Sequence, residues 1–167
     1  MIVLPGELRT CDRGTLVNAI HGYDTHWLRT EKWGLFWPFI WRRAIHSFQL
    51  HRMHPMTWVD RAGMHYQPDR HEQETDLGSI PPPLRARFPQ DEYEPAYVFH
   101  DSAYRHGGLY TSVTLDGPYK FSRMTRKQAD DLLADIIYAL GGGACKRATI
   151  WTAVRAFGGG NYNAKGA

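Results

Sequence analysis

The sequence contains few cysteines, and their positions exclude two kinds of small protein. Its two cysteines, Cys11 and Cys145, lie far apart, and neither has a second cysteine at the short spacing of a zinc ribbon. A single disulfide between them is conceivable, but two reduced thiols are the simpler expectation. A zinc ribbon and a small secreted enzyme held together by many disulfides are therefore excluded.

The chain also lacks a strong charge of either sign and any long hydrophobic run. Its formal net charge of +3 over 167 residues is too small to predict nucleic-acid binding. The longest apolar stretch, GLFWPFIW at residues 34–41, is far shorter than the roughly 20 residues that span a bilayer. The first residues, MIVLPGELRT, do not resemble a signal peptide. We therefore expect neither a transmembrane segment nor a secretion signal.

Tryptophan, by contrast, is abundant and clustered. Residues 26–66 contain basic residues and most of the six tryptophans, including Trp27, Trp33, Trp37 and Trp41. Pro38 would interrupt a helix in this segment. We expect an irregular arm that packs on a partner protein, or that lies at a lipid surface where aromatic and basic side chains meet headgroups.

The first predicted helix covers residues 95–106. Pro95 suits a first turn, and the glycines at 107 and 108 suit a helix end. At about 100° per residue, one apolar face contains His100 and Tyr104, with Asp101 at its margin. We therefore expect the His100 side chain to point inward and the Asp101 side chain to lie at the rim, where a carboxylate could hold a hard cation such as calcium.

A small β-hairpin and two further helices are expected after this helix. Residues 108–124 have strand-forming residues around the turn sequence Asp116-Gly117-Pro118. Thr125 is a suitable N-cap for a second helix, and a third is expected over about residues 144–157. The second helix has an apolar stripe formed by Ala129, Leu132, Leu133, Ile136, Ile137 and Leu140.

Three aspartates of the second helix differ in their relation to this stripe. Asp131 and Asp135 lie opposite it and are expected in solvent, whereas Asp130 lies at its edge. If the first two helices are antiparallel, Asp130 can meet His100 and orient its imidazole for general-base catalysis. Two simpler interpretations stay open: an ion pair of Asp130 with Arg126, and a core histidine with a single hydrogen bond.

Four blocks of the sequence occur in the order of a known phage family. They are TDLGSIP (75–81), FHDSAYR (99–105), TRKQADDLL (125–133) and IWTAVRAFGG (150–159). Together they resemble the phage and prophage family called domain of unknown function 1353, although Leu77-Gly78 replaces its usual Gly-Ala. The resemblance implies a phage protein, in the virion or the host cytoplasm, with no assigned activity.

A narrower resemblance concerns the helices alone. H-D-x-x-Y followed by A-D on a later helix is similar to phospholipase A2, especially the viral capsid type without a disulfide mesh. The resemblance implies that His100 is the general base, that Asp101 binds calcium, and that Tyr104 and Asp130 brace the histidine. It also implies a calcium-binding loop, for which Gly78 and Asp76 are the candidates.

Two other functions compete with this interpretation. A two-metal phosphohydrolase would use His71 as a further ligand, together with Asp130 or Asp135, but the proline-rich segment between His71 and His100 does not suit its all-helical fold. The stronger alternative is a non-enzymatic virion or tail protein that reuses the fold and docks through residues 26–66.

We therefore predict an α+β, mainly α protein with a phospholipase A2-like pair of antiparallel helices, a small β-hairpin and an irregular aromatic-rich N-terminal arm. Residues 1–66 would form strands and the docking arm, 67–157 the helical core and 158–167 a flexible tail. The predicted function is a calcium-dependent ester hydrolase. Its expected partners are other virion proteins or a phospholipid surface, and not nucleic acid.

Overall fold

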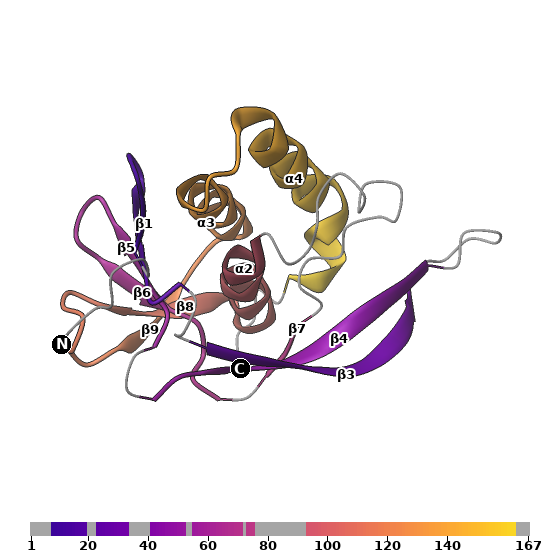
Figure 1. The fold of residues 1–167 in the computed structure, drawn as a ribbon, viewed down its shortest axis with the longest axis horizontal. Coiled ribbons are helices and arrows are strands. Elements are labelled where there is room, and N and C mark those ends of the chain that lie inside the picture. The colour runs from indigo at the N-terminus through magenta and orange to yellow at the C-terminus, as the bar shows by residue number, and fades with distance from the viewer. Residues whose placement is uncertain are drawn as a thin grey trace.

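The computed structural model describes residues 8–19, 23–33, 41–52, 55–71, 73–75 and 93–162. In this part of the chain, three α-helices pack beside two antiparallel β-sheets (Figure 1). The larger sheet has the strand order β1-β2-β5-β6-β8-β9. Its strands are β1 (Arg9–Cys11), β2 (Gly14–Val17), β5 (Thr57–Asp60), β6 (His65–Gln67), β8 (Gly108–Ser112) and β9 (Lys120–Arg123).

The smaller sheet is a long hairpin with a short third strand. β3 (Tyr23–Trp33) pairs with β4 (Trp41–Leu50) from Tyr23 opposite Leu50 to Trp33 opposite Trp41. β7 (Gln73–Thr75) pairs only with residues 46–48 of β4. The hairpin therefore continues beyond β7 as a two-stranded ribbon, which extends away from the helices in Figure 1.

Local sequence signals set the ends of the helices. α2 (Glu94–His106) has Pro95 in its first turn and ends at Gly107, whose φ of 70° is in the left-handed region that glycine tolerates. α3 (Arg126–Ala139) begins with a capping box between Thr125 and Gln128. α4 (Ala144–Phe157) continues into a 3-10 turn, η2 (Gly158–Asn161).

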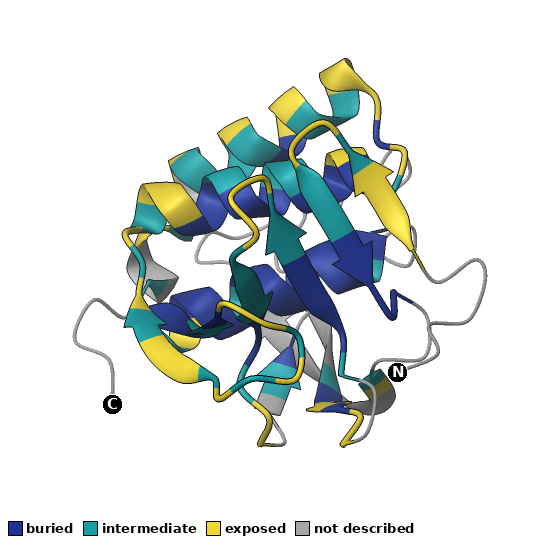
Figure 2. Cartoon of the chain, turned by 90° about the vertical axis from the view of Figure 1, so that its left-hand side faces the viewer, coloured by how far each residue is buried: buried dark blue, intermediate teal, exposed yellow. Residues whose placement is uncertain are grey.

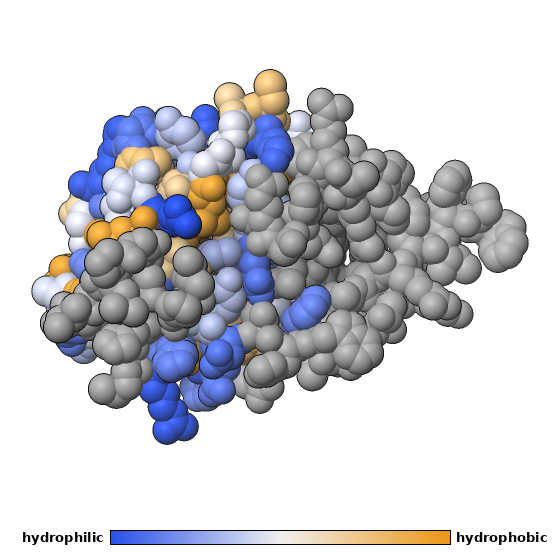
Figure 3. Space-filling view, viewed as in Figure 1, coloured by the Kyte–Doolittle hydropathy of each residue, from blue (hydrophilic) through white to orange (hydrophobic). Residues whose placement is uncertain are grey.

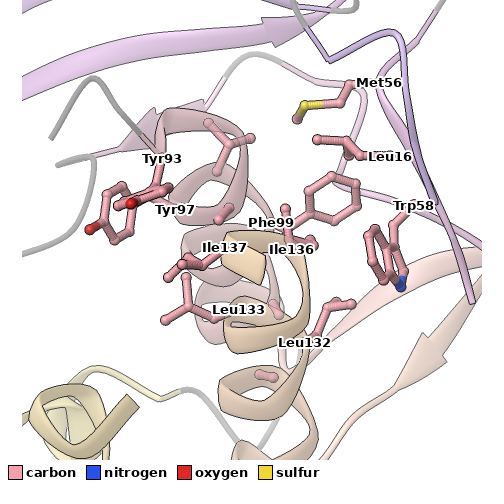
Figure 4. Packing of buried hydrophobic residues seen from close by; sticks show 14 of the residues in the cluster. Leu16, Met56, Trp58, Tyr93, Tyr97, Phe99, Leu132, Leu133, Ile136 and Ile137 are labelled. Atoms are coloured by element: carbon pink, nitrogen blue, oxygen red, sulfur yellow. The ribbon is translucent and has the colours of Figure 1, made fainter. Parts of the chain in front are cut away.

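The hydrophobic core lies between α2, α3 and the larger sheet. Leu16 of β2 and Trp58 of β5 are almost completely buried and lie near Phe99 of α2 and Ile136 of α3 (Figure 4). Figure 2 shows that the buried residues of strands and helices face one another, while exposed residues follow the outside of α4. Burial of each such large side chain stabilises the fold by roughly 1.5–3 kcal/mol.

α2 and α3 are antiparallel. Tyr104, late in α2, contacts Arg126 at the start of α3, and the earlier His100 contacts the later Asp130. As the chain advances along α2, its contacts move backwards along α3, so the two helices run in opposite directions. The apolar face of α2 therefore meets the apolar stripe of α3. This arrangement was the condition under which Asp130 could reach His100.

The predicted fold class is wrong in its balance of helix and strand. More of the described residues lie in the strands than in the α-helices, and the expected irregular arm contains the paired strands β3 and β4, with one register shift between Trp27 and Arg29. Trp37 and Pro38 of that arm lie outside the described residues. Most of the missed strands have three to five residues, which is too short for an alternating pattern to stand out. Their pairing is also non-local, as in β6 with β8, where His65 lies opposite Ser112.

The expected segments are joined in the structure. The division between residues 66 and 67 falls within β6, and the larger sheet takes strands from both sides of it. In the expected tail, Tyr162 packs edge-on against Tyr104 and its hydroxyl donates to the Met124 carbonyl. Residues 163–167 lie outside the described part.

Cys11 and Cys145 are free thiols. None of the described helices has the length and apolar character needed to cross a membrane.

Candidate functional site

The centre of the candidate site is the buried carboxylate of Asp130. Its side chain is 0% exposed, and three groups contact it. His100 Nε2 lies 3.0 Å from Oδ1, the Tyr104 hydroxyl donates to the same oxygen at 2.5 Å, and Arg155 Nη1 donates to Oδ2 at 2.9 Å. A buried carboxylate is stable only when its charge is compensated and its oxygens accept hydrogen bonds. Here both conditions are met.

The contact with Asp130 fixes the tautomer of neutral His100. An ionised carboxylate only accepts hydrogen bonds, so Nε2 must carry the proton that it donates to Asp130. Nδ1 then has the lone pair. It lies on the side of Asp101, 3.8 Å from that residue's Oδ1. The site therefore presents an imidazole nitrogen that can accept a proton.

Tyr104 connects this carboxylate to Arg126. The tyrosine hydroxyl donates to Asp130 and accepts a hydrogen bond from Arg126 Nε at 3.0 Å. Arg126 Nη2 in turn donates to the carbonyls of Val154 and Arg155 at 2.7 and 2.6 Å. One guanidinium thus holds the end of α4 against α2 and orients the tyrosine.

The chain after α4 covers the tyrosine side of the site. An added Cβ at Gly158 would lie 3.1 Å from Tyr104 Cε1, and one at Gly159 would lie 3.1 Å from Arg126 Nη1. Both distances are shorter than ordinary van der Waals contact, so the glycines allow close approach. Tyr162, which follows this segment, packs edge-on against the Tyr104 ring.

Burial and hydrogen bonding act in opposite directions on the histidine–aspartate pair. Burial by itself would lower the pKa of His100, but its interactions with Asp101 and Asp130 outweigh this and raise the pKa above 6.5. Burial would raise the pKa of Asp130, but hydrogen bonds from His100, Tyr104 and Arg155 hold it below 3.8. Both shifts favour the ion pair.

Tyr104 remains a neutral donor over the physiological range. Burial, followed by its hydrogen bond to the negative Asp130, raises the pKa of Tyr104 to about 12. The hydroxyl therefore keeps its proton and can stabilise the carboxylate at any pH where the protein is expected to work.

Asp101 lies at the rim, as its place on the helix predicts. Its side chain is 21% exposed, against 8% for His100, and it accepts a hydrogen bond from the Thr75 hydroxyl. Asp76 and Gly78, the other expected calcium ligands, lie outside the described residues. The described residues contain no group of three His, Cys, Asp or Glu side chains that could hold a metal.

Asp131 and Asp135 differ from the expectation of two solvated carboxylates. The Asp131 side chain is 43% exposed; it pairs with Lys127 Nζ at 2.6 Å and accepts a hydrogen bond from Trp151 Nε1 of α4 at 3.0 Å. Asp135 is partly buried, and this burial raises its pKa. Helix α4 covers this side of α3, which a helical wheel of α3 alone does not include.

The alternative of a two-metal centre is not supported by His71. Its side chain is 90% exposed and pairs with Asp69 at 2.9 Å. Asp130 is engaged on both oxygens by other groups. These two candidate ligands therefore belong to different interactions.

Two members of the network were not assigned by the sequence. Arg155 was given no role, and Arg126 was considered only as an ion-pair partner of Asp130, whereas it binds Tyr104. The available signal was the need of a buried carboxylate for a cation. Both arginines stand in the sequence blocks TRKQADDLL and IWTAVRAFGG.

Comparison with protein families gives a match over the part of the chain that contains the site. The family described as "Protein of unknown function (DUF1353)" matches residues 65–154, more than half of the chain. This range includes His100, Asp101, Tyr104 and Asp130 and ends one residue before Arg155. No curated protein and no solved structure matches.

Proposed function

This chain belongs to the family of proteins of unknown function DUF1353, and from the geometry of the site we propose that it is a hydrolase in which His100 activates water for attack on an ester. The observation that carries the proposal is the contact between His100 Nε2 and the fully buried Asp130 at 3.0 Å. It leaves Nδ1 as the basic nitrogen on the side of the rim residue Asp101.

The proposed chemistry is general-base catalysis. A water molecule beside Nδ1 would transfer a proton to His100 as its oxygen attacks the ester carbonyl carbon. The imidazolium formed is stabilised by Asp130, and the proton then passes to the leaving alcohol. General-base assistance of this kind contributes about 10²- to 10⁴-fold in rate. No step of this proposal uses a metal.

Tyr104 and Asp130 act on the histidine, not on the substrate. Asp130 is 0% exposed and Tyr104 is 5% exposed. Asp130 contacts Nε2, and the Tyr104 hydroxyl contacts the same Asp130 oxygen while its ring centroid lies 4.0 Å from that of the imidazole. They fix the tautomer and the orientation of His100. We therefore assign them as positioning residues, and His100 as the catalytic residue.

The proposed substrate class is a carboxylic ester, with phospholipid as the first choice. This choice depends on the similarity of H-D-x-x-Y and A-D to phospholipase A2. It also depends on the contact of His100 with Asp130, since that family likewise has a histidine base braced by an aspartate. The proposal includes a phage origin, as the similarity of the four sequence blocks implies.

The test is release of fatty acid from phospholipid micelles by the full-length protein. We expect the wild type to exceed His100→Gln by about 100-fold or more. His71→Gln is the matched control, because that histidine is exposed and belongs to another interaction; it should retain wild-type activity. The assay is run with calcium and with a chelator. Equal background rates for wild type and His100→Gln in both conditions would refute the hydrolase.

A non-enzymatic role in a virus particle is the second candidate. It is favoured by the hydrogen bonds of Asp130, both of whose carboxylate oxygens have partners. Asp130 itself is on α3, and its three partners are on α2 and α4, so the network joins three helices. Such a network can serve as a structural brace without catalysis. In this case the protein would be present at fixed copy number in purified particles of the encoding phage, and its absence from them would argue against this role.

A further inference from the structure

The large hydrophobic side chains exposed on the described surface are scattered. They are Leu8, Val113, Phe121 and Tyr138, which come from different segments. On the face shown in Figure 3, the described hydrophilic and hydrophobic residues are interspersed. Single exposed apolar side chains of this kind are ordinary in proteins. A small cavity lined by charged residues is the more distinctive feature of this surface.

This cavity, which we call the arginine cavity, has a volume of about 220 Å³. Its walls come from four segments outside the strands: Asn18 after β2, Arg52 and Pro55 before β5, Arg70 after β6, and residues 115–117 between β8 and β9. The volume is below the roughly 300–1,000 Å³ of pockets for drug-sized ligands, so the cavity suits a small molecule.

The side chains that anchor the arginine cavity point away from the core. Met56 and Trp58 belong to the core cluster, so Thr57 between them points to the other face of the larger sheet. Gln67 is hydrogen-bonded to Thr57 and to Arg70. None of the residues that line the cavity takes part in the buried carboxylate network. The cavity is therefore a second site.

Arg70 is fixed by a buried side chain. Gln67 is 0% exposed; its Nε2 donates to Thr57 Oγ1 at 2.9 Å, and its Oε1 accepts from Arg70 Nε and Nη2 at 3.2 and 2.9 Å. The guanidinium also lies over the Tyr119 ring, 5.4 Å from its centroid. Two of the five N–H groups of the arginine are used in this way, which leaves three for a ligand. An arginine that is fixed before binding loses less entropy when it binds an anion.

The turn that carries Asp116 is connected to the same tyrosine. The Tyr119 hydroxyl donates to the Leu115 carbonyl at 3.2 Å. The ring on which Arg70 lies therefore also holds the wall that includes Asp116, and the two charged groups have defined positions around the cavity.

Asn18 forms a further fixed wall. It is 3% exposed, and its carboxamide nitrogen donates to the Pro55 carbonyl at 3.2 Å. Its φ of 55° is in the left-handed region, which few residues other than glycine adopt. Residues held in such conformations cluster at active sites and ligand clamps.

The charges around the arginine cavity do not neutralise one another. Among the described residues, neither Arg52 nor Arg70 has a carboxylate within salt-bridge distance, and Asp116 has no basic partner at that distance. The cavity thus presents two positive charges and one negative charge. A complementary ligand has two negative charges and one positive charge.

We propose that the arginine cavity binds a small phosphate monoester that also has an ammonium group, such as a phosphorylated amino alcohol. A phosphate monoester has a charge of about −1.5 to −2 at pH 7, and arginine binds phosphate through paired hydrogen bonds. The ammonium group balances Asp116. An amino acid would leave one arginine without a counter-charge, and inorganic phosphate would leave Asp116 facing negative charge. This site does not involve His100 and goes beyond the proposed hydrolase.

The test is isothermal titration calorimetry of the full-length protein with O-phosphoethanolamine and, as the reference, with inorganic phosphate. We expect O-phosphoethanolamine to bind about tenfold more tightly, because phosphate lacks the ammonium group. Arg70→Gln should weaken its binding about tenfold or more, since hydrogen bonds to a charged group are lost. Arg123→Gln is the matched control: this arginine is also exposed but lies on β9, outside the cavity, and the variant should bind like the wild type.

Glycerophosphoethanolamine distinguishes a free monoester from the headgroup of a lipid. Its phosphate is a diester with a single negative charge, so we expect it to bind about tenfold more weakly than O-phosphoethanolamine. Equal or tighter binding of the diester would contradict the charge balance on which the proposal depends.

Asp116→Asn should have opposite effects on the two phosphate ligands. It should weaken binding of O-phosphoethanolamine and strengthen binding of inorganic phosphate, a pair of changes that misfolding does not produce. The proposal is overturned if neither ligand binds, if phosphate binds the wild type as tightly as O-phosphoethanolamine, or if Arg70→Gln and Arg123→Gln have the same affinity.

Discussion

At the scale of single residues, the charge of Asp130 governs the site. A fully buried carboxylate with three hydrogen-bond donors cannot lose one of them without leaving part of its charge uncompensated. His100, Tyr104 and Arg155 are therefore coupled through it. Arg155 is 34% exposed and can be replaced without creating a cavity in the core.

Replacement of Arg155 by methionine should destabilise the protein by about 1.5–3 kcal/mol, the usual contribution of a hydrogen bond to a charged group. Lys127→Met is the matched control, because its ion pair with Asp131 is exposed and should contribute less than about 1 kcal/mol. Urea unfolding of both variants checks this difference. If the two losses were equal, the Asp130 network would not be a determinant of stability.

The raised pKa of His100 makes stability depend on pH in a defined direction. The folded protein holds this proton more tightly than the unfolded chain. The contribution is therefore complete below pH 6.5 and is lost as the pH rises through the higher pKa of the folded state. The lowered pKa of Asp130 contributes above 3.8 and is lost as the pH falls through its folded value.

We therefore expect the difference in free energy of unfolding between wild type and His100→Gln to be largest between about pH 4 and 6.5 and to shrink at alkaline pH. Urea unfolding at a series of pH values measures it. His71→Gln, which changes an exposed histidine, should show no such trend. A difference that grows with pH would mean that His100 is neutral in the folded state throughout. In the hydrolase, activity should rise with pH as His100 loses its proton.

At the scale of elements, the two adjacent glycines at the junction of α2 and β8 are required for different structural reasons. Gly107 has the positive φ that ends the helix. At Gly108 an added Cβ would lie 2.2 Å from the Ser122 carbonyl oxygen of β9. From the sequence alone, both glycines are explained as the end of the helix. In the structure, glycine is needed at position 108 because β9 lies too close for a side chain.

Gly108→Ala should therefore destabilise the protein by about 2 kcal/mol or more, because the backbone of β9 must move away. Gly143→Ser is the control: the space around its Cβ is open, and serine is a favourable N-cap for α4. Thermal unfolding should show a lower melting temperature only for Gly108→Ala. An unchanged melting temperature would show that β8 and β9 can separate without loss of the fold.

At the scale of the whole molecule, the core requires strands that precede the matched family segment. β1, β2 and β5 come before residue 65, and Leu16, Met56 and Trp58 from this part are at most 1% exposed. α2 and α3 pack against these side chains. The segment 65–154 thus contains the site residues His100, Tyr104 and Asp130. It does not contain the apolar side chains of the preceding strands, against which the other face of α2 and α3 is buried.

A fragment of residues 65–167 should consequently fail to fold cooperatively, whereas the full chain unfolds in one transition. Its helices would lose the burial of three large side chains, each contributing roughly 1.5–3 kcal/mol, which is a large fraction of the stability of a small domain. Near-ultraviolet circular dichroism and thermal unfolding distinguish the two cases. A cooperative transition in the fragment would show that the helices form an independent domain.

The sequence by itself determined what depends on near neighbours along the chain. The helix ends follow from Pro95, Gly107 and Thr125, and the 3.6-residue period places His100 and Tyr104 inward, Asp101 at the rim and Asp130 at the edge of its stripe. The meeting of His100 with Asp130 needed only the further assumption of antiparallel helices.

Only the tertiary structure decided the balance of the fold and the rest of the network. The short strands are stabilised by partners far along the chain, so their own sequence is a weak signal. Arg155 reaches Asp130 because α4 packs beside α3, and Arg126 turns to Tyr104 because the end of α4 supplies carbonyls for its second nitrogen. Such contacts depend on where helices cross in space, which no periodicity within a single helix encodes.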